Sequence, residues 1–164
     1  MSTQINKDWL FVDGNKIFNY RSTGVLINDG KILIQRGVND QEFALPGGHV
    51  KWGETSADAL IREYREELNA DVSIDRMIWV EEVFWKWGKR DAHTLCHYYL
   101  ARLNNPRQIP TEGTFLSRED DESRLIFEWV DIGTLGSYKI YPSFLADKIM
   151  NLSDGIEHYI SVET

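Results

Sequence analysis

The chain has 164 residues, of which 42% are hydrophobic and 27% charged, which is typical of one soluble globular domain and excludes an intrinsically disordered chain. Its formal net charge of −8 argues against sequence-independent binding to nucleic acid, and no apolar run reaches the roughly 20 residues of a membrane-spanning helix. The single Cys96 excludes an intrachain disulfide, and the first residues show no secretory signal, so we expect a cytoplasmic protein with no membrane partner.

The first half of the chain is predicted to begin with β-strands. Residues 16–22 and 24–27 are rich in β-branched and aromatic residues, which favours strands. The sequence NDG at residues 28–30 is typical of a hairpin turn, and the alternating residues 31–36 form the next expected strand. Residues 44–55 contain three glycines and predict a loop with unusual backbone angles.

Residues 55–69 are predicted to form a helix. Thr55 is a good N-cap, and Asp58 three residues later completes the pattern of a capping box. Asn69 favours the left-handed conformation that ends a helix. The apolar residues recur at helical period and form one stripe, made of Ala57, Leu60, Ile61, Tyr64 and Leu68. We therefore expect an amphipathic helix whose stripe packs against the core.

The second half of the chain is predicted to be mostly strand. Residues 76–87 and 94–103 have the alternation of long strands, and residues 127–130 that of a short strand. Polar residues with two prolines predict a long loop at 104–124, and a second helix is expected from 141 to about 151. Together these elements predict an α+β fold, in which helices cover the faces of a mixed β-sheet.

The first helix carries three glutamates on neighbouring positions of its surface. Glu63, Glu66 and Glu67 stand at i, i+3 and i+4, on one flank of the apolar stripe. A run of charges on a helix is usually a solvated face, and like charges at this spacing cost only a few tenths of a kcal/mol. The alternative is a site for a hard cation such as Mg²⁺, which takes oxygen ligands.

The spacing of residues upstream of these glutamates favours the cation site. Five residues separate Gly48 from Glu54, and seven more separate Glu54 from Arg62. The segment 48–70 therefore resembles the Nudix box, Gly-x5-Glu-x7-Arg-Glu-aliphatic-x-Glu-Glu-x-Gly-aliphatic. All the glycine and charged positions up to the last glutamate match, namely Gly48, Glu54, Arg62, Glu63, Glu66 and Glu67.

The match to the Nudix box has two departures. Tyr64 stands where an aliphatic residue is usual, and Asn69 stands where glycine is usual. Tyr64 lies on the apolar stripe and can still pack, and Asn is the next-best residue for a left-handed conformation. Neither departure affects a charged position of the box.

The resemblance to the Nudix hydrolases, a MutT-like family, carries implications for the whole chain. It implies a single Nudix domain over residues 1–164, with an α/β/α sandwich in which a mixed sheet lies between helices. It implies Mg²⁺-dependent hydrolysis, with Mn²⁺ as a second cation, of a nucleoside diphosphate linked to another moiety, which makes the substrate a nucleotide, a nucleotide sugar or a dinucleotide. Many members are dimers, so a homodimer is one assembly that the resemblance suggests.

The resemblance also implies roles for individual residues of the box. The metal ligands would be the Gly47 carbonyl and the carboxylates of Glu63, Glu66 and Glu67. Arg62 would orient these carboxylates and share in catalysis. Gly48 and Glu54 would support the ligands from behind, at the junction between loop and helix.

Residues outside the box have weaker signals. Arg21 and Arg36 could contact phosphate, and Trp85, Trp87 and His93 could contact the substrate. Packing in the core or in a dimer explains the tryptophans equally well. A histidine near a strand turn is more often structural, and this applies to His93 as well as to other histidines.

The general base is not fixed by the sequence. Members of the family take it from the box or from a later loop. The loop candidates are Glu112, Glu119, Asp120, Asp121 and Glu122, each of which could equally be a solvated side chain. On the long strand, Glu81 or Glu82 could face the site, and His97 could interact with phosphate.

Three other functions remain open at this point. The chain could remove phosphates from the 5′ end of RNA, although its net charge argues against this. It could be a catalytically inactive, nucleotide-binding Nudix regulatory module, although the complete set of glutamates disfavours such a loss of activity. An isomerase on the same fold is a further option. A P-loop is excluded, because no Gly-Lys-[Ser/Thr] sequence follows the glycines.

Overall fold

The computed structural model of the protein describes residues 7–118 and 124–164. The strands are β1 (Leu10–Asp13), β2 (Lys16–Asn28), β3 (Lys31–Gly37), β4 (Phe43–Ala44), β5 (Gly47–His49), β6 (Val72–Trp87), β7 (Arg90–Leu103), β8 (Thr114–Leu116), β9 (Leu125–Asp131), β10 (Ile140–Tyr141) and β11 (Glu157–Val162). The helices are α1 (Ser56–Leu68) and α2 (Leu145–Lys148), with 3₁₀ segments η1 (Ile132–Ser137) and η2 (Ile149–Asn151). No helix in the described ranges is long and apolar enough to cross a membrane.

The strands form a mixed sheet with β2 at its centre. The order across the sheet is β10-β4-β3-β2-β7-β6-β11. β2 runs parallel to β7 and antiparallel to β3, and β6 runs antiparallel to β7 and parallel to β11. β5 also pairs with β2, through Arg21 to Thr23. The long β2 therefore connects the two halves of the sheet and holds the loop that precedes α1.

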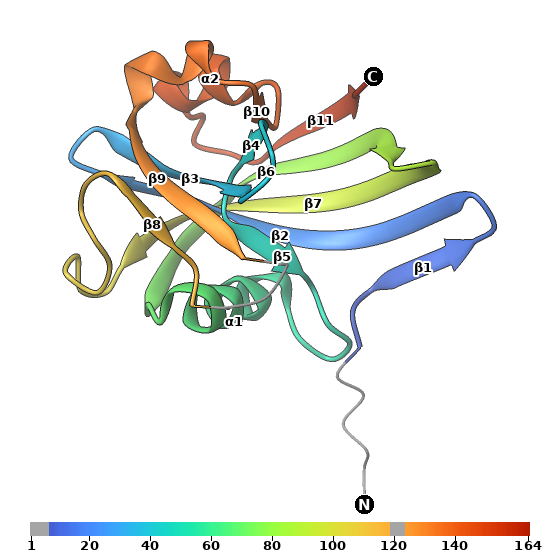
Figure 1. The fold of residues 1–164 in the computed structure, drawn as a ribbon, viewed down its shortest axis with the longest axis horizontal. Helices are drawn as coiled ribbons and strands as arrows, with labels where there is room; N and C mark the ends of the chain where they lie inside the picture. The colour runs from blue at the N-terminus through green and yellow to red at the C-terminus, as the bar shows by residue number, and fades with distance from the viewer. Residues whose placement is uncertain (1–6, 119–123) are drawn as a thin grey trace, which may run out of the picture.

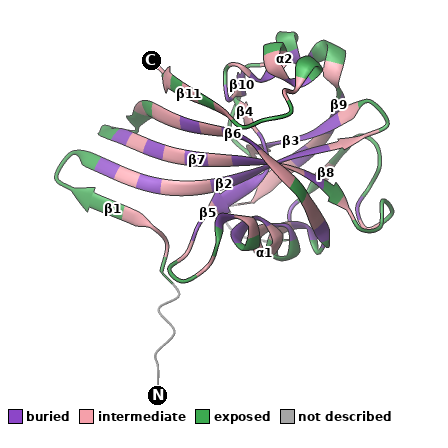
Figure 2. Ribbon diagram, turned by 180° about the vertical axis from the view of Figure 1, so that it is seen from behind, coloured by how far each residue is buried: buried purple, intermediate pink, exposed green. Residues whose placement is uncertain are grey.

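Consecutive residues of the central strands point to opposite faces, and each face has its own helix. On β2, Leu26 packs in a cluster with Leu60 and Tyr64 of α1. Its neighbour Val25 belongs to a second cluster, which contains Leu145 of α2. Figure 1 shows α1 and α2 on opposite sides of the sheet, and Figure 2 shows the buried strand residues between them. The predicted sandwich of a mixed sheet between helices is confirmed.

Helix α1 has the ends that the sequence predicts. The Thr55 side chain accepts a hydrogen bond from the Asp58 N–H, and its backbone is extended with ψ of 158°. Asn69 adopts the left-handed conformation with φ of 51°, and its N–H donates to Arg65. Because both ends are fixed by local contacts, the register of the glutamates on α1 is fixed as well.

Several elements differ from the expected ones. β6 and β7 begin earlier than expected, and the region 104–124 contains the short strand β8. The expected helix from 141 to 151 is reduced to α2 and η2, because Ile140 and Tyr141 pair with β4 and Pro142 follows. β11 was not expected, and it pairs along β6 from Trp79 to Phe84.

Candidate active site

Two glycines bring the loop before α1 into close contact with its surroundings. A Cβ atom on Gly47 would lie 2.2 Å from the backbone oxygen of Ser22, and one on Gly48 would lie 2.3 Å from Cδ of Glu63. Only glycine permits such approaches. The backbone at these two glycines therefore lies directly against β2 on one side and against the Glu63 carboxylate on the other.

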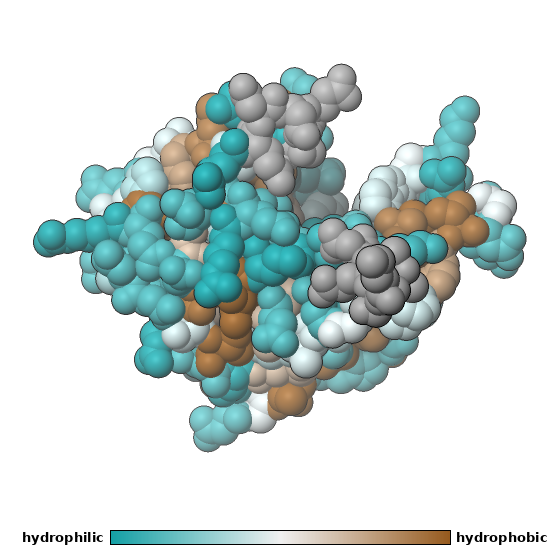
Figure 3. All heavy atoms as spheres, turned by 90° about the horizontal axis from the view of Figure 1, so that it is seen from below, coloured by the Kyte–Doolittle hydropathy of each residue, from teal (hydrophilic) through white to brown (hydrophobic). Residues whose placement is uncertain are grey.

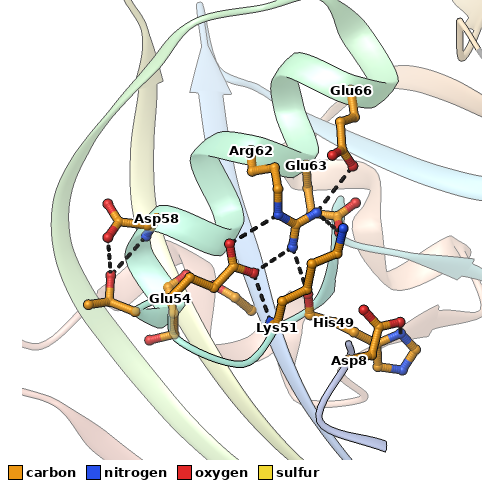
Figure 4. A network of polar contacts seen from close by, with 11 residues as sticks. Asp8, His49, Lys51, Glu54, Asp58, Arg62, Glu63 and Glu66 are labelled. Atoms are coloured by element: carbon orange, nitrogen blue, oxygen red, sulfur yellow. Dashed lines mark hydrogen bonds and ion pairs between the residues drawn. The ribbon is translucent and has the colours of Figure 1, made fainter. Parts of the chain in front are cut away.

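Arg62 joins the loop and the glutamates into one network, drawn in Figure 4. Its Nε and Nη2 donate to the two oxygens of Glu54 at 3.1 and 2.7 Å. Its Nη1 donates to Glu63 at 2.8 Å and to Glu66 at 3.1 Å. Nη2 also donates to the backbone oxygen of His49 at 3.0 Å. One guanidinium therefore holds three carboxylates and the loop backbone in fixed relative positions.

The network changes the pKa values of its members in different directions. Burial raises the pKa of Glu63, against the opposing effect of Arg62. Burial also acts to raise the pKa of Glu54, but the hydrogen bonds from Arg62 and from the Lys51 N–H outweigh it and the pKa is lowered. The pKa of Arg62 is raised despite its burial, because Glu54 and Glu63 stabilise the charged form.

The predicted box residues line one wall of a cavity of about 860 Å³. Figure 3 looks onto this side of the molecule, where α1 lies, and most of the residues coloured there are hydrophilic. The ionisable residues that line the cavity are Lys7, Asp8, Arg21, His49, Lys51, Arg62, Glu63, Glu66 and Glu67. Gly47, Gly48 and Gln35 line it as well. Of the predicted metal ligands and their supports, all but Glu54 reach the cavity wall, and Glu54 acts through Arg62.

The donor set of this wall fits a hard divalent cation. Carboxylate and carbonyl oxygens are the ligands that Mg²⁺ and Mn²⁺ prefer, and the wall offers Glu63, Glu66 and Glu67 beside the loop at Gly47. Among the described residues, no group of three Asp, Glu, His or Cys side chains is already arranged to hold a metal ion. Arg62 donates to Glu63 and Glu66, so binding a cation would require these carboxylates to reorient.

A second cavity, of about 430 Å³, adjoins the first through Arg21, which lines both. Its wall includes Glu81, which is 2% exposed and accepts a hydrogen bond from the Tyr98 hydroxyl at 2.7 Å. Burial raises the pKa of Glu81, and the nearby Glu163 adds to the effect, while hydroxyl groups oppose it. Trp85 and Cys96 contribute apolar surface to the same wall.

The other expected substrate contacts lie outside the first cavity. Arg36 donates to the backbone oxygen of Asp40 at 3.0 Å and lies over the Phe43 ring. Trp87 is near the cavity, because its ring stacks on His49 at 6.3 Å between centroids. His93 stacks on Phe84 at 4.3 Å, away from the cavity wall.

The candidates for a general base outside the box are also scattered. Glu112 is exposed in the loop before β8, and the Glu82 carboxylate lies 3.8 Å from Nε2 of His93 and 3.0 Å from Nε2 of His158. His97 accepts or donates hydrogen bonds with Tyr20 and Ser56, both at 3.0 Å, beneath the start of α1. The loop candidates Glu119, Asp120, Asp121 and Glu122 lie outside the described residues.

Sequence reasoning did not identify several residues of the first cavity. His49 directly follows the first glycine of the box, so its place in the sequence could have predicted that it lies at the site. Burial and the charge of Arg21 lower the pKa of His49 to about 4. Lys51 stands in the same loop. Lys7 and Asp8 gave no signal, because an antiparallel bridge between Asp8 and Lys51 brings them there from more than forty residues away.

Comparisons with known proteins agree with the fold and the motif. Residues 19–147 match the NUDIX domain family. An ADP-ribose pyrophosphatase from Streptococcus suis superposes with a TM-score of 0.57 at 16% identity, covering 87% of this chain and 98% of that one. A NUDIX hydrolase from Nitrosomonas europaea gives 0.59 at 16% identity, covering 80% and 86%. A UDP-X diphosphatase gives 0.50 at 15% identity, covering 70% of this chain and 51% of that one.

Proposed function

We propose that the chain is a Mg²⁺-dependent pyrophosphohydrolase of nucleoside diphosphates linked to another group. The chain belongs to the NUDIX domain family, whose hydrolases act on pyrophosphate bonds. Mn²⁺ would serve as a second cation. The substrate would be a dinucleotide, a nucleotide sugar or another small nucleotide-type molecule. We also propose one Nudix domain over residues 1–164. Outside the matched range, β1 pairs with β2 and β11 pairs with β6, which supports this extent.

One observation carries this proposal. Glu63, Glu66 and Glu67 line the same cavity as Gly47, and Arg62 fixes two of these carboxylates against the loop. A solvated acidic face would not need an arginine that makes five hydrogen bonds within a half-buried network. We therefore assign the metal ligands to Gly47, Glu63, Glu66 and Glu67.

The residues of the chain would prepare the site in three ways. Arg62 and Glu54 hold the loop and the helix at fixed relative positions, so that only the side chains of Glu63 and Glu66 would have to turn towards a cation. Arg21 offers a guanidinium, which suits the two oxygens of a phosphate group, at the junction of the two cavities. A bound divalent cation supplies charge neutralisation of the pyrophosphate and a water of lowered pKa.

The base that receives a proton from the attacking water would come from the Nudix box or from the later loop that precedes β9. The backbone oxygen of Glu67 accepts a hydrogen bond from the Arg118 N–H at 2.8 Å. This contact brings Arg118 next to the C-terminal part of α1, and Glu119 and Glu122, which follow it in the sequence, stay candidates on the sequence alone. Glu112 belongs to the same region of the chain and stays a weaker candidate.

The second cavity would hold the part of the substrate beyond the phosphates. Its wall is largely apolar and includes Trp85, and it also offers the polar groups Glu81, Tyr98 and Thr94. A flat, uncharged ring with hydrogen-bonding groups suits such a wall better than a second anion does, because Glu42, Glu81 and Glu163 lie around it. This supports a nucleotide-type substrate, without naming its base.

The experiment that tests the proposal is a panel of substrates with product analysis. The purified protein is incubated with nucleoside di- and triphosphates, dinucleotides, nucleotide sugars and 5′-triphosphorylated RNA, each with Mg²⁺, with Mn²⁺ and with chelator. We expect cation-dependent release of a nucleoside monophosphate from a linked diphosphate. Selective release of pyrophosphate from the RNA would favour the RNA-end hydrolase. No cleavage of any member would leave the nucleotide-binding module as the better function.

A further inference from the structure

Residues 7–10 precede the range that matches the family, yet three of them line the first cavity. These are Lys7, Asp8 and Leu10. Residues at a wall of a site can bind what enters it, so the question is whether this segment is fixed in place and which groups it contributes.

The segment is fixed to the loop between β5 and α1 by its backbone and by a ring contact. The Trp9 N–H donates to the oxygen of Val50 at 2.9 Å, and the Trp52 N–H donates to the oxygen of Lys7 at 2.9 Å. The rings of Trp9 and Trp52 stack with centroids 4.1 Å apart and an angle of 7° between their planes. Residues 7–9 are therefore attached to the loop of the Nudix box by two backbone hydrogen bonds and one ring contact.

This attachment places two lysines on neighbouring backbones. Asp8 and Lys51 are partners in an antiparallel bridge, so Lys7 stands next to this pair. Figure 4 shows Lys51 beside Glu54 and Arg62, and Asp8 beside the ring of His49 on the side of the network away from Asp58. The Asp8 carboxylate lies 3.6 Å from Nδ1 of His49, so its nearest charged or polar side-chain partner is His49 and neither lysine.

The charges of the cavity indicate what these lysines can do. Arg62 is committed to Glu54, Glu63 and Glu66, so its guanidinium is not available to an incoming anion. Among the described residues that line the cavity, the remaining cations are Lys7, Arg21 and Lys51. The charge of Lys51 acts on Glu54 and that of Arg21 on Glu63, but neither side chain forms an ion pair with another described residue. Lysine ammonium groups on flexible stems bind phosphate oxygens as point charges.

We propose that Lys7 and Lys51 form an anion-binding pair that contacts phosphate oxygens of the substrate, which makes residues 7–10 part of the substrate site. The identification of the anion as a diphosphate rests on the proposed function. Lys7 and Lys51 come from the N-terminal segment and the loop before α1, whereas the carboxylate ligands come from α1, so the pair binds oxygens that the cation does not hold. Lys7 is then a specificity-determining residue that the family's matched range does not contain.

A competing explanation is that the two lysines only offset repulsion among the carboxylates of α1. That explanation predicts an effect of removing Lys7 on stability and none on anion affinity. The two explanations therefore separate in a binding measurement made together with thermal unfolding.

The test is calorimetric titration of the full chain with ADP and with UDP, in the presence of Mg²⁺. We expect Lys7→Gln and Lys51→Gln each to raise Kd by about tenfold or more, the scale of a lost hydrogen bond to a charged group. Lys7→Arg should stay within about twofold of the unchanged protein, because it keeps the charge. The matched control is Lys31→Gln, which removes the same charge at the start of β3 and should leave Kd unchanged.

A second pair of variants tests the attachment of the segment. Trp9→Ala removes the ring that stacks on Trp52 and should raise Kd as Lys7→Gln does, whereas Trp9→Phe should largely preserve binding. Equal Kd values for Lys7→Gln and Lys31→Gln, or a fall in Tm with unchanged Kd, would overturn the inference, as would a failure of the unchanged protein to bind either diphosphate. Binding without hydrolysis of any substrate would contradict the proposed function and leave this inference standing.

Discussion

Arg62 is the residue through which the acidic cluster of α1 becomes part of a site. Its five hydrogen bonds go to three side chains and one backbone oxygen, and they span both the loop and the helix. Glu63, which touches it at 2.8 Å, also approaches Gly48 so closely that a Cβ there would overlap its carboxylate. The guanidinium of Arg62, which contacts both Glu63 and Glu66, thus reduces the repulsion among the carboxylates of α1.

Removing the Arg62 side chain should destabilise the protein in a pH-dependent way. At pH 7, Arg62→Ala leaves Glu54 and Glu63 without their partner, and we expect a loss of about 1–3 kcal/mol in the free energy of unfolding. The Glu54 pKa is lower in the folded protein, so its contribution is present above the unfolded value of 4.5 and is lost as pH falls through the folded value. The difference between the two proteins should shrink in acid.

Denaturant unfolding at pH 7 and at pH 4 measures this difference. The matched control is Arg65→Ala, which breaks the exposed pair with Asp71 and should cost less than about 0.5 kcal/mol at either pH. Equal losses for the two variants at pH 7 would contradict the role given to Arg62.

Glu67 should matter for turnover far more than for folding. It lies at the end of the carboxylate row, lines the cavity and has a half-exposed side chain. Glu67→Gln keeps the shape and removes the charge, so kcat is expected to fall by at least about 100-fold, the scale of a lost catalytic or metal-orienting group. Steady-state kinetics on the substrate found in the panel measures this, with Asp154→Asn, in the exposed turn before β11, as the control. Retained activity would refute the metal-site assignment.

Glu81 is a buried carboxyl group whose ionisation should oppose folding. Burial raises its pKa in the folded protein, and the unfolded value is 4.5. The unchanged protein should therefore lose stability as pH rises from 4.5 towards the folded pKa, by about 1.4 kcal/mol for each pH unit between the two values. Glu81→Gln, which can still accept the bond from Tyr98, should remove this loss and raise Tm at pH 7–8 but not at pH 4. Thermal unfolding across this range checks it; a uniform fall in Tm would count against it.

At the scale of elements, the loop before α1 and the helix itself act as one unit. The loop is held by β2 on one side, by Arg62 on the other and by the N-terminal segment at its tip. Its backbone comes so near Glu63 that no side chain fits at Gly48. A change in the loop should therefore be felt at the carboxylates.

Gly48→Ala is expected to damage the site by displacing Glu63. The added Cβ would lie 2.3 Å from Cδ and 2.4 Å from Oε1 of Glu63, so the carboxylate or the loop must move. We expect a loss of about 10–100-fold in activity or metal affinity, as for other groups that orient metal ligands. Gly133→Ala is the matched control, because a Cβ there meets nothing within 4 Å. Equal activities of the two variants would show that Glu63 is not held by this contact.

The sequence predicts best those features that are fixed by contacts close along the chain. Thr55 and Asn69 cap α1 within a few residues, so its ends and the register of its glutamates follow from the sequence. The shortness of α2 was not predictable from its apolar pattern, because Tyr141, the first residue of the expected helix, pairs with β4 instead. β11 and residues 7–10 join partners far along the chain, and only the assembled sheet brings them together.

At the scale of the whole molecule, β2 links both cavities and both sides of the sandwich. Arg21, on β2, lines the two cavities, and the same strand pairs with β5, β7 and β3. The protein is acidic overall, with net charge −8, so an anionic substrate meets repulsion at long range. In the proposed function, the local cations of the cavity and a bound divalent cation would offset this repulsion.

Binding of a divalent cation to the folded state should therefore raise the stability of the whole protein. A ligand that binds only the native state stabilises it by about 2.7 kcal/mol at 100 times its Kd, which corresponds to roughly 2–4 °C in Tm per kcal/mol at this size. We expect Tm to rise with Mg²⁺ and with Mn²⁺, after chelation as the reference. Glu66→Gln should reduce the rise, because a ligand is lost, while its unliganded Tm stays close to that of the unchanged protein, since Glu66 is exposed and its bond to Arg62 is 3.1 Å long. Equal rises in the variant and in the unchanged protein would show that the cation binds elsewhere.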